Sequence, residues 1–329
     1  MTLRLGVLGA ARITPAAVLK PAHLVDGVEV VAVAARDRAK ASAFAERHGI
    51  STVHGSYADL IADPEIDAIY NPLPNGLHGR TTLEALDAGK HVLCEKPLTA
   101  NAEEAALVAE RARGVAPVVF EAFHYRYHPL MVRVEEILRS GELGQIREVN
   151  TSMCVPVPMG KDIRGDLSLA GGAAMDIGCY AVNLWRVLAG AEPTVQSARA
   201  TLLRPGIDRA MVASLATATG VIGSVTCSLW SWRLLAASAT VVGTTGRLRI
   251  INPLQPQVFH RLQVRSAAGR RAETFGRSAT YTHQLTAFRD ACVDGKPFPT
   301  TADDAVATME VLDQMYEGSG LGRRMPTPA

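Results

Sequence analysis

Apolar residues in the first third of the chain cluster in short runs of β-branched and aliphatic side chains. Most runs stop at a glycine, proline or helix-capping residue, and a helical stretch follows. Strands are predicted at 3–8, 28–34, 52–54, 66–70, 91–94 and 118–120. This alternation with short connections predicts an α/β fold with a parallel, doubly wound sheet and helices on both faces.

The pattern changes at about Phe123. Strands separated by turn residues are predicted at 146–154, 194–203, 210–217, 221–231, 238–242, 248–251, 257–264 and 272–275. Helices are predicted at 129–139, near 173–188, and at 281–293 and 301–315. Consecutive strands with short turns predict a large, mainly antiparallel sheet. We therefore expect one domain over residues 1–122 and a second, α+β domain over residues 123–329.

Composition narrows the class of protein. The 329 residues carry 34 basic and 32 acidic side chains, a net charge of +2, which gives no electrostatic case for nucleic acid. No apolar run approaches the ~20 residues of a membrane helix, and the N-terminus lacks the regions of a signal peptide. Five scattered cysteines without a C-x-x-C pair fit a reducing compartment. We expect a cytoplasmic protein with no membrane partner and no metal.

The turn after the first predicted strand has the position of a dinucleotide-binding turn. Gly9 would let the backbone approach a pyrophosphate, and the following helix would offer N–H groups and the positive end of its dipole. The glycine fingerprint is incomplete, because Ala11 and Thr14 replace its second and third glycines. The position of the turn therefore favours a nucleotide site over a plain structural turn.

The end of the second predicted strand bears on the choice of nucleotide. NAD sites place Asp or Glu there for the ribose 2′-hydroxyl, whereas this chain has Ala35 followed by Arg36. A guanidinium can pair with a 2′-phosphate and lie against adenine. We therefore expect NADP, and NAD stays possible because Asp37 could reach a 2′-hydroxyl.

Three further residues carry candidate chemistry. Lys96 is one of six lysines, against 28 arginines, and lies at the carboxyl end of a predicted central strand. A cation there can hydrogen-bond a reacting oxygen, although an isolated lysine at a strand end is more often only solvated. Asp176 and Tyr180 are four residues apart and would share a helix face. An acid there could hold a substrate hydroxyl and a phenol could exchange a proton.

Taken together and in order, the motifs resemble those of the Gfo/Idh/MocA oxidoreductases, the glucose–fructose oxidoreductase and inositol dehydrogenase family. The similarity runs along essentially the whole chain, and it is carried by residues 6–13, 71–78, 92–98, 121–129 and 169–180. The resemblance implies an N-terminal Rossmann domain and a C-terminal domain that binds substrate and whose open sheet commonly forms the oligomer interface. It also implies NAD(P)-dependent dehydrogenation or reduction of a sugar, polyol or related carbonyl compound.

The resemblance further implies site residues. Tyr180 would exchange the hydroxyl proton, Lys96 would bring its pKa closer to neutral, and Asp176 would orient a substrate hydroxyl. Many family members carry histidine at the position of Tyr180. The tyrosine looks like the branch with glucose–fructose oxidoreductase, NADP-dependent xylose dehydrogenases and dimeric dihydrodiol dehydrogenases. The residues expected to bind the cofactor are Gly9, Ala11, Arg12, Ile13, Arg36, Asn71, Pro72, Leu73, Asn75, His78, Glu95, Lys96, Pro97 and Arg164.

Two alternatives stay open. Within the enzymes, the protein could be a trans-dihydrodiol or dicarbonyl oxidoreductase. In another class, some proteins similar to this family bind the dinucleotide without turnover and act as regulators. The expected partners are a small-molecule substrate and further copies of the chain, forming a dimer or tetramer. Trp230 and Trp232, two apart on a predicted strand, would share a face in the sheet's interface or core.

Overall fold

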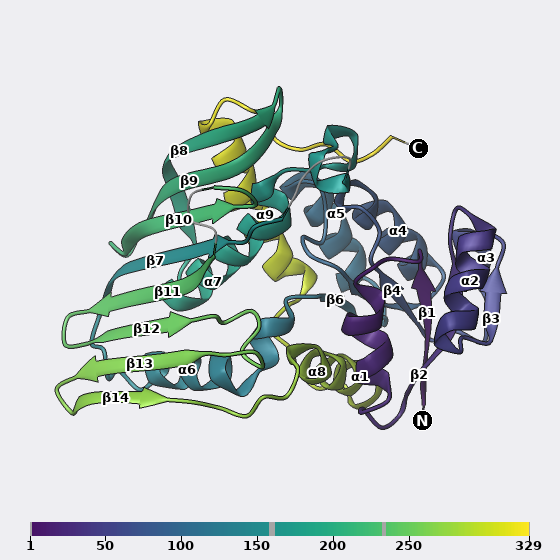
Figure 1. Ribbon diagram of the computed structural model, residues 1–329, viewed down its shortest axis with the longest axis horizontal. Helices are drawn as coiled ribbons and strands as arrows, with labels where there is room; N and C mark the ends of the chain where they lie inside the picture. The colour runs from purple at the N-terminus through teal and green to yellow at the C-terminus, as the bar shows by residue number, and fades with distance from the viewer. Residues whose placement is uncertain (1, 158–161, 232–234, 329) are drawn as a thin grey trace. The chain divides into compact units, whose positions relative to one another are not determined.

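Two β-sheets organise the chain in the computed structural model, which describes residues 2–157, 162–231 and 235–328 (Figure 1). The chain forms two compact units, each assembled from two segments. The first contains Met1–His124 and Tyr281–Val306, and the second contains Tyr125–Thr280 and Ala307–Ala329. The expected domains, residues 1–122 and 123–329, are continuous stretches of the chain, whereas each of these units also contains a segment from the C-terminal part of the chain. The division into those two domains stays a prediction.

A six-stranded parallel sheet forms the first unit, in the order β3-β2-β1-β4-β5-β6. Its strands are β1 (Leu3–Leu8), β2 (Val28–Ala34), β3 (Thr52–His54), β4 (Ala68–Asn71), β5 (His91–Cys94) and β6 (Val119–Glu121). The helices between them are α1 (Lys20–Ala22), α2 (Arg38–His48), α3 (Tyr57–Ala62), α4 (Asn75–Asp87) and α5 (Ala102–Arg113). The strand order reverses between β1 and β4, and open α/β sheets bind ligands at that switch point. The predicted doubly wound sheet is confirmed.

Capping residues fix where the helices of this unit begin. The Asp37 carboxylate accepts hydrogen bonds from two backbone N–H groups in the first turn of α2, at 3.0 and 3.2 Å, and Gly49 ends the helix with a φ of 68°. Asn101 caps α5 by accepting from the Glu104 backbone N–H at 2.9 Å. These caps set the lengths of the loops that leave the carboxyl edge of the sheet.

An eight-stranded sheet forms the core of the second unit, in the order β14-β13-β12-β11-β7-β10-β9-β8. Its strands are β7 (Ile146–Cys154), β8 (Pro193–Arg204), β9 (Ile207–Thr217), β10 (Ile222–Ser228), β11 (Ala236–Gly243), β12 (Arg247–Ile251), β13 (Arg261–Ser266) and β14 (Gly269–Glu273). Among the described strands of this sheet, only β7 and β10 pair in parallel, so the predicted, mainly antiparallel sheet is confirmed.

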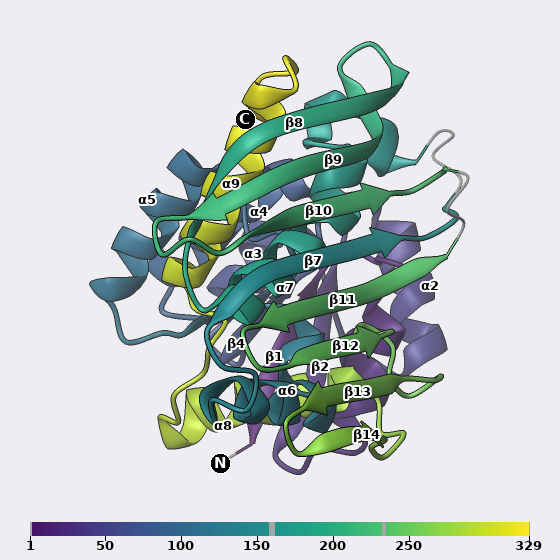
Figure 2. The same cartoon turned by 90° about the vertical axis from the view of Figure 1, so that its left-hand side faces the viewer.

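Helices cover one face of this sheet. They are α6 (Pro129–Arg139), α7 (Cys179–Ala189) and the C-terminal turns of α9 (Ala302–Gly318). Figure 2 looks onto the opposite face, where the strands lie in front of the helices. The remaining helix, α8 (Thr280–Asp294), belongs almost entirely to the first unit.

Two local features depart from the predicted pattern. The strand expected at 221–231 ends at Ser228, so Trp230 lies in a bend with 51% of its surface exposed, and Trp232 lies outside the described residues. Pro15–Leu19 and Ala174–Gly178 form π-helical turns where α-helix was expected. Such turns are rare and frequently occur at functional sites. The first follows the predicted nucleotide-binding turn, and the second lies within the motif at 169–180.

None of the helices in the described ranges has the length and apolar character needed to cross a membrane.

Candidate functional site

The loop after β1 has the geometry of a phosphate-binding turn. Gly9 has a φ of 84°, where glycine is favoured, and a Cβ there would lie 3.2 Å from Cδ2 of Leu73. Thr14 is fully buried, and its Oγ1 has no hydrogen-bond partner within the described part of the chain. Leaving a buried hydroxyl unsatisfied is costly, so this atom is available to a ligand. The outer part of the turn consists of Ala11, Arg12 and Ile13.

Arg36 follows β2 at the same edge of the sheet and is exposed. The Tyr57 hydroxyl is hydrogen-bonded to the Arg36 backbone and lies 3.9 Å from the position that a Cβ on Gly9 would take. Burial raises the pKa of Tyr57, and the charge of Arg36 opposes that rise. Sequence reasoning missed Tyr57 because it follows the Ser56 helix cap rather than a strand, where nucleotide contacts are expected.

His78 fixes two loops at the carboxyl edge of the sheet. Its ring is 1% exposed, with Nδ1 2.7 Å from the Pro97 carbonyl oxygen and Nε2 2.6 Å from that of Leu73. Asn71 braces the same loop, because its Nδ2 donates to Thr81 Oγ1 at 2.7 Å. Both residues, expected to bind the cofactor, therefore shape the loop from within. The other predicted residues of this turn are Pro72, Leu73 and Asn75.

The segment after β5 carries the predicted cation. Glu95 is 9% exposed and accepts a hydrogen bond from the Tyr70 hydroxyl at 2.9 Å. Lys96 is half-buried, and its peptide bond to Pro97 is cis. The Lys96 charge lowers the pKa of the buried His78 and His124. Its ammonium group therefore lies among neutral rings at the carboxyl end of a central strand.

Burial keeps both histidines neutral at pH 7. It lowers the pKa of His78 to about 4 and that of His124 to about 3, with the Lys96 charge acting in the same direction. Two carbonyl oxygens facing His78 favour its protonated form, but burial outweighs them. The His124 ring packs on Tyr281 of α8, with centroids 4.2 Å apart. A C-terminal helix therefore supplies part of the surroundings of the Lys96 segment within the first unit.

In the second unit, an arginine holds the predicted acid. Asp176 lies in the π-helical turn Ala174–Gly178. Arg164 Nε donates to Asp176 Oδ2 at 2.6 Å, and Arg164 NH1 donates to Asp162 Oδ1 at 2.9 Å. Arg164 thus bridges two carboxylates and fixes the orientation of Asp176, a contact that sequence spacing did not indicate.

Tyr180 lies in the first turn of α7 and is 6% exposed. Its ring centroid is 6.1 Å from that of Tyr125, inclined at 60°. The Tyr125 hydroxyl donates to Asn183 Oδ1 at 2.7 Å, one turn further along α7. Tyr125 and Asn183 therefore form a rigid support next to Tyr180.

A buried ion pair supports the turn that leads into α7. Asp208 of β9 accepts from the Ala174 backbone N–H at 2.7 Å, and from Tyr316 Oη and Arg324 NH2 at 3.0 Å each. Arg324 is 1% exposed, and its Nε donates to the Gly171 carbonyl oxygen at 2.9 Å. The C-terminal tail is therefore part of the scaffold beneath the Asp176 segment.

Gly172 completes this turn at a φ of 129°, and a Cβ there would lie 2.2 Å from Asp208 Oδ1. Its backbone N–H donates to the Arg164 carbonyl oxygen at 2.8 Å, which joins the turn to the loop that holds Asp176. Sequence reasoning missed Asp208 and Arg324, because 116 positions separate them and each resembles a surface charge. The only local indication in the sequence was the pair Gly171 and Gly172, because glycines are expected where a side chain would not fit.

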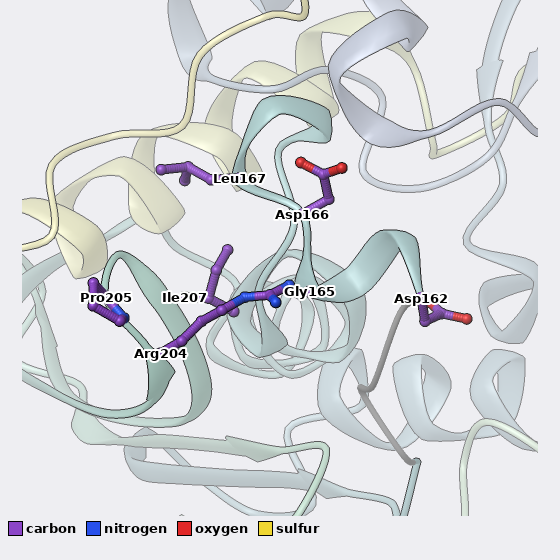
Figure 3. Close-up of a pocket in the computed structure, with 7 residues that line it drawn as sticks. All are labelled: Asp162, Gly165, Asp166, Leu167, Arg204, Pro205 and Ile207. Atoms are coloured by element: carbon purple, nitrogen blue, oxygen red, sulfur yellow. The ribbon is translucent and has the colours of Figure 1, made fainter.

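A hollow of about 410 Å³ opens beside the Arg164 loop in the second unit (Figure 3). Figure 3 shows the Arg204 side chain reaching toward Gly165. The lining residues come from the loop at 162–167 and from the β8–β9 turn; they are Asp162, Gly165, Asp166, Leu167, Arg204, Pro205 and Ile207. Carboxylates and a guanidinium around one hollow suit a ligand with several hydroxyl groups.

No three His, Cys, Asp or Glu side chains in the described ranges are grouped so as to hold a metal ion.

Comparison with known proteins identifies relatives of both units. Residues 3–123 match the oxidoreductase family with NAD-binding Rossmann fold, and residues 131–249 match the GFO/IDH/MocA C-terminal domain. A D-xylose 1-dehydrogenase (NADP(+)) of Haloferax volcanii is 37% identical over 321 residues, covering 96% of this chain and 97% of that protein. A trans-1,2-dihydrobenzene-1,2-diol dehydrogenase of Sus scrofa is 35% identical over 231 residues, covering 68% of this chain and 67% of that protein.

A solved structure resembles the chain over almost its full length. The crystal structure of a 3-ketoreductase from Actinomadura kijaniata, in complex with NADP and TDP-benzene, covers 97% of this chain and 98% of its own at 27% identity and a TM-score of 0.85. The doubly wound parallel sheet of the first unit and the α+β fold of the second are typical of a class of dinucleotide-dependent oxidoreductases. Within that class, this chain belongs to the Gfo/Idh/MocA family, as its motifs predicted.

Acid should destabilise the first unit through its buried histidines. His78 and His124 are neutral when folded but take up a proton near pH ~6.5 when unfolded. Because the unfolded state binds more protons, the free energy of unfolding falls as the pH drops from about 6.5 toward 4, by up to roughly 1.4 kcal/mol per pH unit for each ring. Tm measured from about pH 7.5 to about 4.5 should fall, and His124→Phe, which keeps a ring against Tyr281, should flatten the slope.

The matched control is His23→Gln, since His23 is exposed at the end of α1. It should leave the pH slope of the wild type unchanged. A His124→Phe slope identical to that of wild type would contradict the assignment.

Proposed function

We propose that the protein is an oxidoreductase that prefers NADP(H) and transfers a hydride to or from a sugar, polyol or related carbonyl or hydroxyl compound. The observation that carries this proposal is the nucleotide edge of the first unit, where Gly9, the buried hydroxyl of Thr14 and Arg36 come together. The names of two relatives agree with it. The Haloferax enzyme is a D-xylose dehydrogenase that uses NADP(+), and the Actinomadura ketoreductase is complexed with NADP.

The residues at this edge fit a dinucleotide that carries a 2′-phosphate. Gly9 leaves room for a pyrophosphate, the Thr14 hydroxyl can donate to one of its oxygens, and Arg36 can pair with the 2′-phosphate. The Oδ1 atom of Asp37 caps α2 by accepting from the backbone N–H groups of Ala39 and Lys40, so the capping role accounts for this carboxylate without a nucleotide. When bound, NADP supplies the hydride acceptor or, in reduced form, the hydride donor.

We assign proton exchange to Tyr180, substrate orientation to Asp176 and an assisting role to Lys96. The phenol would take the substrate hydroxyl proton during oxidation and return it during reduction. A phenol ionises near pH ~10 unless a cation stabilises its anion, and Lys96 is our candidate for that cation. Arg164 holds the Asp176 carboxylate in one orientation through their 2.6 Å contact.

A trans-dihydrodiol dehydrogenase is the second candidate, favoured by the Sus scrofa relative of that name. Both candidates need the same chemistry, hydride transfer at a carbon that bears a hydroxyl group. They differ in the rest of the substrate, which is polar in a sugar and apolar in an arene diol. The carboxylates and arginine around the hollow at 162–167 favour the sugar.

We also propose that a second copy of the chain covers the helix-free face of the eight-stranded sheet. Val212 on β9 is 48% exposed and Ile222 on the neighbouring β10 is 58% exposed, and the strand register places both on this face. Trp230 adds a further exposed aromatic ring beyond β10. Apolar side chains gathered on one exposed sheet face are typical of self-association.

Removing the Arg36 guanidinium should abolish the preference for NADP. Arg36→Ala should lower kcat/KM for NADPH by roughly 10–100-fold, because charge-assisted hydrogen bonds to the 2′-phosphate are lost, and should change kcat/KM for NADH by less than about threefold. Initial rates with both nucleotides measure this. The control is Arg38→Ala, an exposed arginine two positions along the chain. A wild type that is stabilised more by NAD than by NADP would contradict the proposal.

Removing the acid–base group should stop turnover without releasing the nucleotide. Tyr180→Phe and Lys96→Ala should each lower kcat by about 10²–10⁴-fold, and Tyr180→Phe should leave the Kd for NADPH nearly unchanged. The control for the lost charge is Lys40→Ala, at an exposed position on α2. The substrate panel should contain aldoses, ketoses, polyols, dicarbonyls and an arene dihydrodiol. NADPH binding without turnover on any of them would favour a non-catalytic regulator.

Charging the helix-free sheet face should separate the copies. Sedimentation velocity at micromolar concentration should give a dimer or tetramer for the wild type and a monomer for the double variant Val212→Asp/Ile222→Asp, since buried carboxylates without partners oppose association. Leu107→Asp, at a 54% exposed position on α5 of the first unit, is the control and should keep the wild-type mass. A monomeric wild type would overturn this part of the proposal.

A further inference from the structure

The hollow beside the Arg164 loop has one wall on the loop at 162–167 and the other on the β8–β9 turn (Figure 3). Arg204 and Ile207 are paired across that turn, so their side chains lie on the same face. The Ile207 side chain is 1% exposed and lines the hollow together with Arg204. The loop leads into α7, which lies behind the strands in Figure 2. The hollow is therefore on the helix side of the sheet and not on the face proposed for a second copy.

The loop that forms the first wall is held in one conformation by its own backbone. The Gly165 N–H donates to the Asp162 carbonyl oxygen at 2.9 Å, and the Gly171 N–H donates to the Asp166 carbonyl oxygen at 2.9 Å. A Cβ on Gly171 would lie 2.7 Å from that Asp166 oxygen, so the loop is closely packed at this point. The wall is thus formed before any ligand arrives, as is usual for sites that bind small molecules.

The polar groups of the hollow can both accept and donate hydrogen bonds. Asp166 uses Oδ1 to accept from the Ser168 N–H and hydroxyl, at 2.9 and 2.7 Å, and its Oδ2 has no hydrogen bond within the described residues. Arg204 is exposed and makes no ion pair in the described ranges, although two carboxylates line the same hollow. A carboxylate accepts from hydroxyl groups and a guanidinium donates to them, so together they can bind neighbouring hydroxyls of one molecule.

Apolar side chains form the rest of the surface. Leu167 is 50% exposed, and Pro205 is exposed beside the buried Ile207. Leu167 Cδ2 lies 3.2 Å from the position of a Cβ on Gly206, so the loop and the turn touch here. A sugar ring carries C–H groups on its faces and hydroxyl groups at its edge, which matches both kinds of surface. The volume of about 410 Å³ falls in the range of about 300–1,000 Å³ that is typical of small-molecule sites.

The hollow is one side chain away from the predicted acid of the reaction. Asp162 lines the hollow and accepts from Arg164 NH1 at 2.9 Å, and Nε of the same guanidinium donates to Asp176 at 2.6 Å. A molecule that contacts both carboxylates has one part at Asp176 and a second part in the hollow. A phosphate group in that second position would face Asp162 and Asp166, and like charges repel, so the hollow favours a neutral group.

We propose that the hollow is a subsite for a second, non-reacting sugar unit, and that the preferred substrate is a disaccharide or related glycoside. This inference rests on the function proposed above, because the reacting unit is the one held by Asp176. Arg204 and Asp166 bind hydroxyl groups of the second unit, and Leu167 and Pro205 pack on its C–H face. Arg204 is then a specificity-determining residue that takes no part in hydride transfer.

The first test compares kcat/KM at saturating NADP(+) for D-glucose and D-xylose with kcat/KM for cellobiose, maltose and xylobiose. The wild type should prefer at least one disaccharide over its own monosaccharide by about tenfold or more. Arg204→Ala should lower that ratio at least about tenfold, because charge-assisted hydrogen bonds to the second unit are lost. The matched control is Arg139→Ala, an exposed arginine at the end of α6, which should keep the wild-type ratio.

A binding measurement makes the test independent of turnover. The three disaccharides are titrated calorimetrically into the Tyr180→Phe variant saturated with NADPH, so that hydride transfer does not consume the ligand. At least one should bind saturably, and adding Arg204→Ala should weaken its Kd about tenfold. If Arg204→Ala unfolds, Arg204→Lys takes its place, since it keeps the charge but loses the bidentate geometry.

The outcomes separate the two proposals. A protein that binds a disaccharide in this way but turns over no sugar would contradict the proposed function and support the subsite. The subsite is overturned if no disaccharide binds saturably, if each monosaccharide is turned over at least as efficiently as its disaccharides, or if Arg204→Ala and Arg139→Ala have equal effects.

Discussion

The Asp208 carboxylate is the point at which four parts of the second unit meet. It receives hydrogen bonds from the turn at Ala174, from Tyr316 in α9 and from Arg324 in the C-terminal tail, while β9 carries it in the sheet. Removing one partner from a buried charge pair typically costs about 3–5 kcal/mol, because the other charge is left unsatisfied. The conformation of the Gly171–Gly172 turn, and with it the placement of Asp176 and Tyr180 in this unit, depends on that one group.

The pattern of neighbouring residues in the sequence predicts the strands, helices and sheets of this fold. It does not predict contacts between residues that are distant in the sequence. The parallel sheet could be predicted because its short apolar segments are followed by helix-capping residues such as Asp37. The interpretation of Arg36 as a phosphate-binding residue follows from its position directly after a strand. Both patterns are contained within a few consecutive residues. Tyr57 reaches the Gly9 turn only because β3 pairs with β2 and α3 packs on the sheet, which no spacing in the sequence reveals. Arg164 shows the same limit, since its role toward Asp176 is set by the fold of a loop.

The net charge of a chain does not show how its charged side chains are distributed, because the strands of a sheet direct alternate side chains to opposite faces. An overall charge of +2 gave no reason to expect a basic surface, yet alternation along β12 and β13 places arginines together on one face and aliphatic residues on the other. On the helix side of the sheet, Arg271 of β14 pairs with Glu273 of the same strand and with Glu142 in the loop before β7. The basic face is therefore a product of topology, and composition alone does not show it.

The presence of a C-terminal segment in each unit also has a consequence for folding during translation. The first unit is incomplete without Tyr281–Val306, and the second is incomplete without Ala307–Ala329, which includes Arg324. Domains of a growing chain commonly fold in order from the N-terminus. Here neither unit can reach its final structure until the segments at 281–306 and 307–329 have left the ribosome, so both sheets lack part of their helical layers until then.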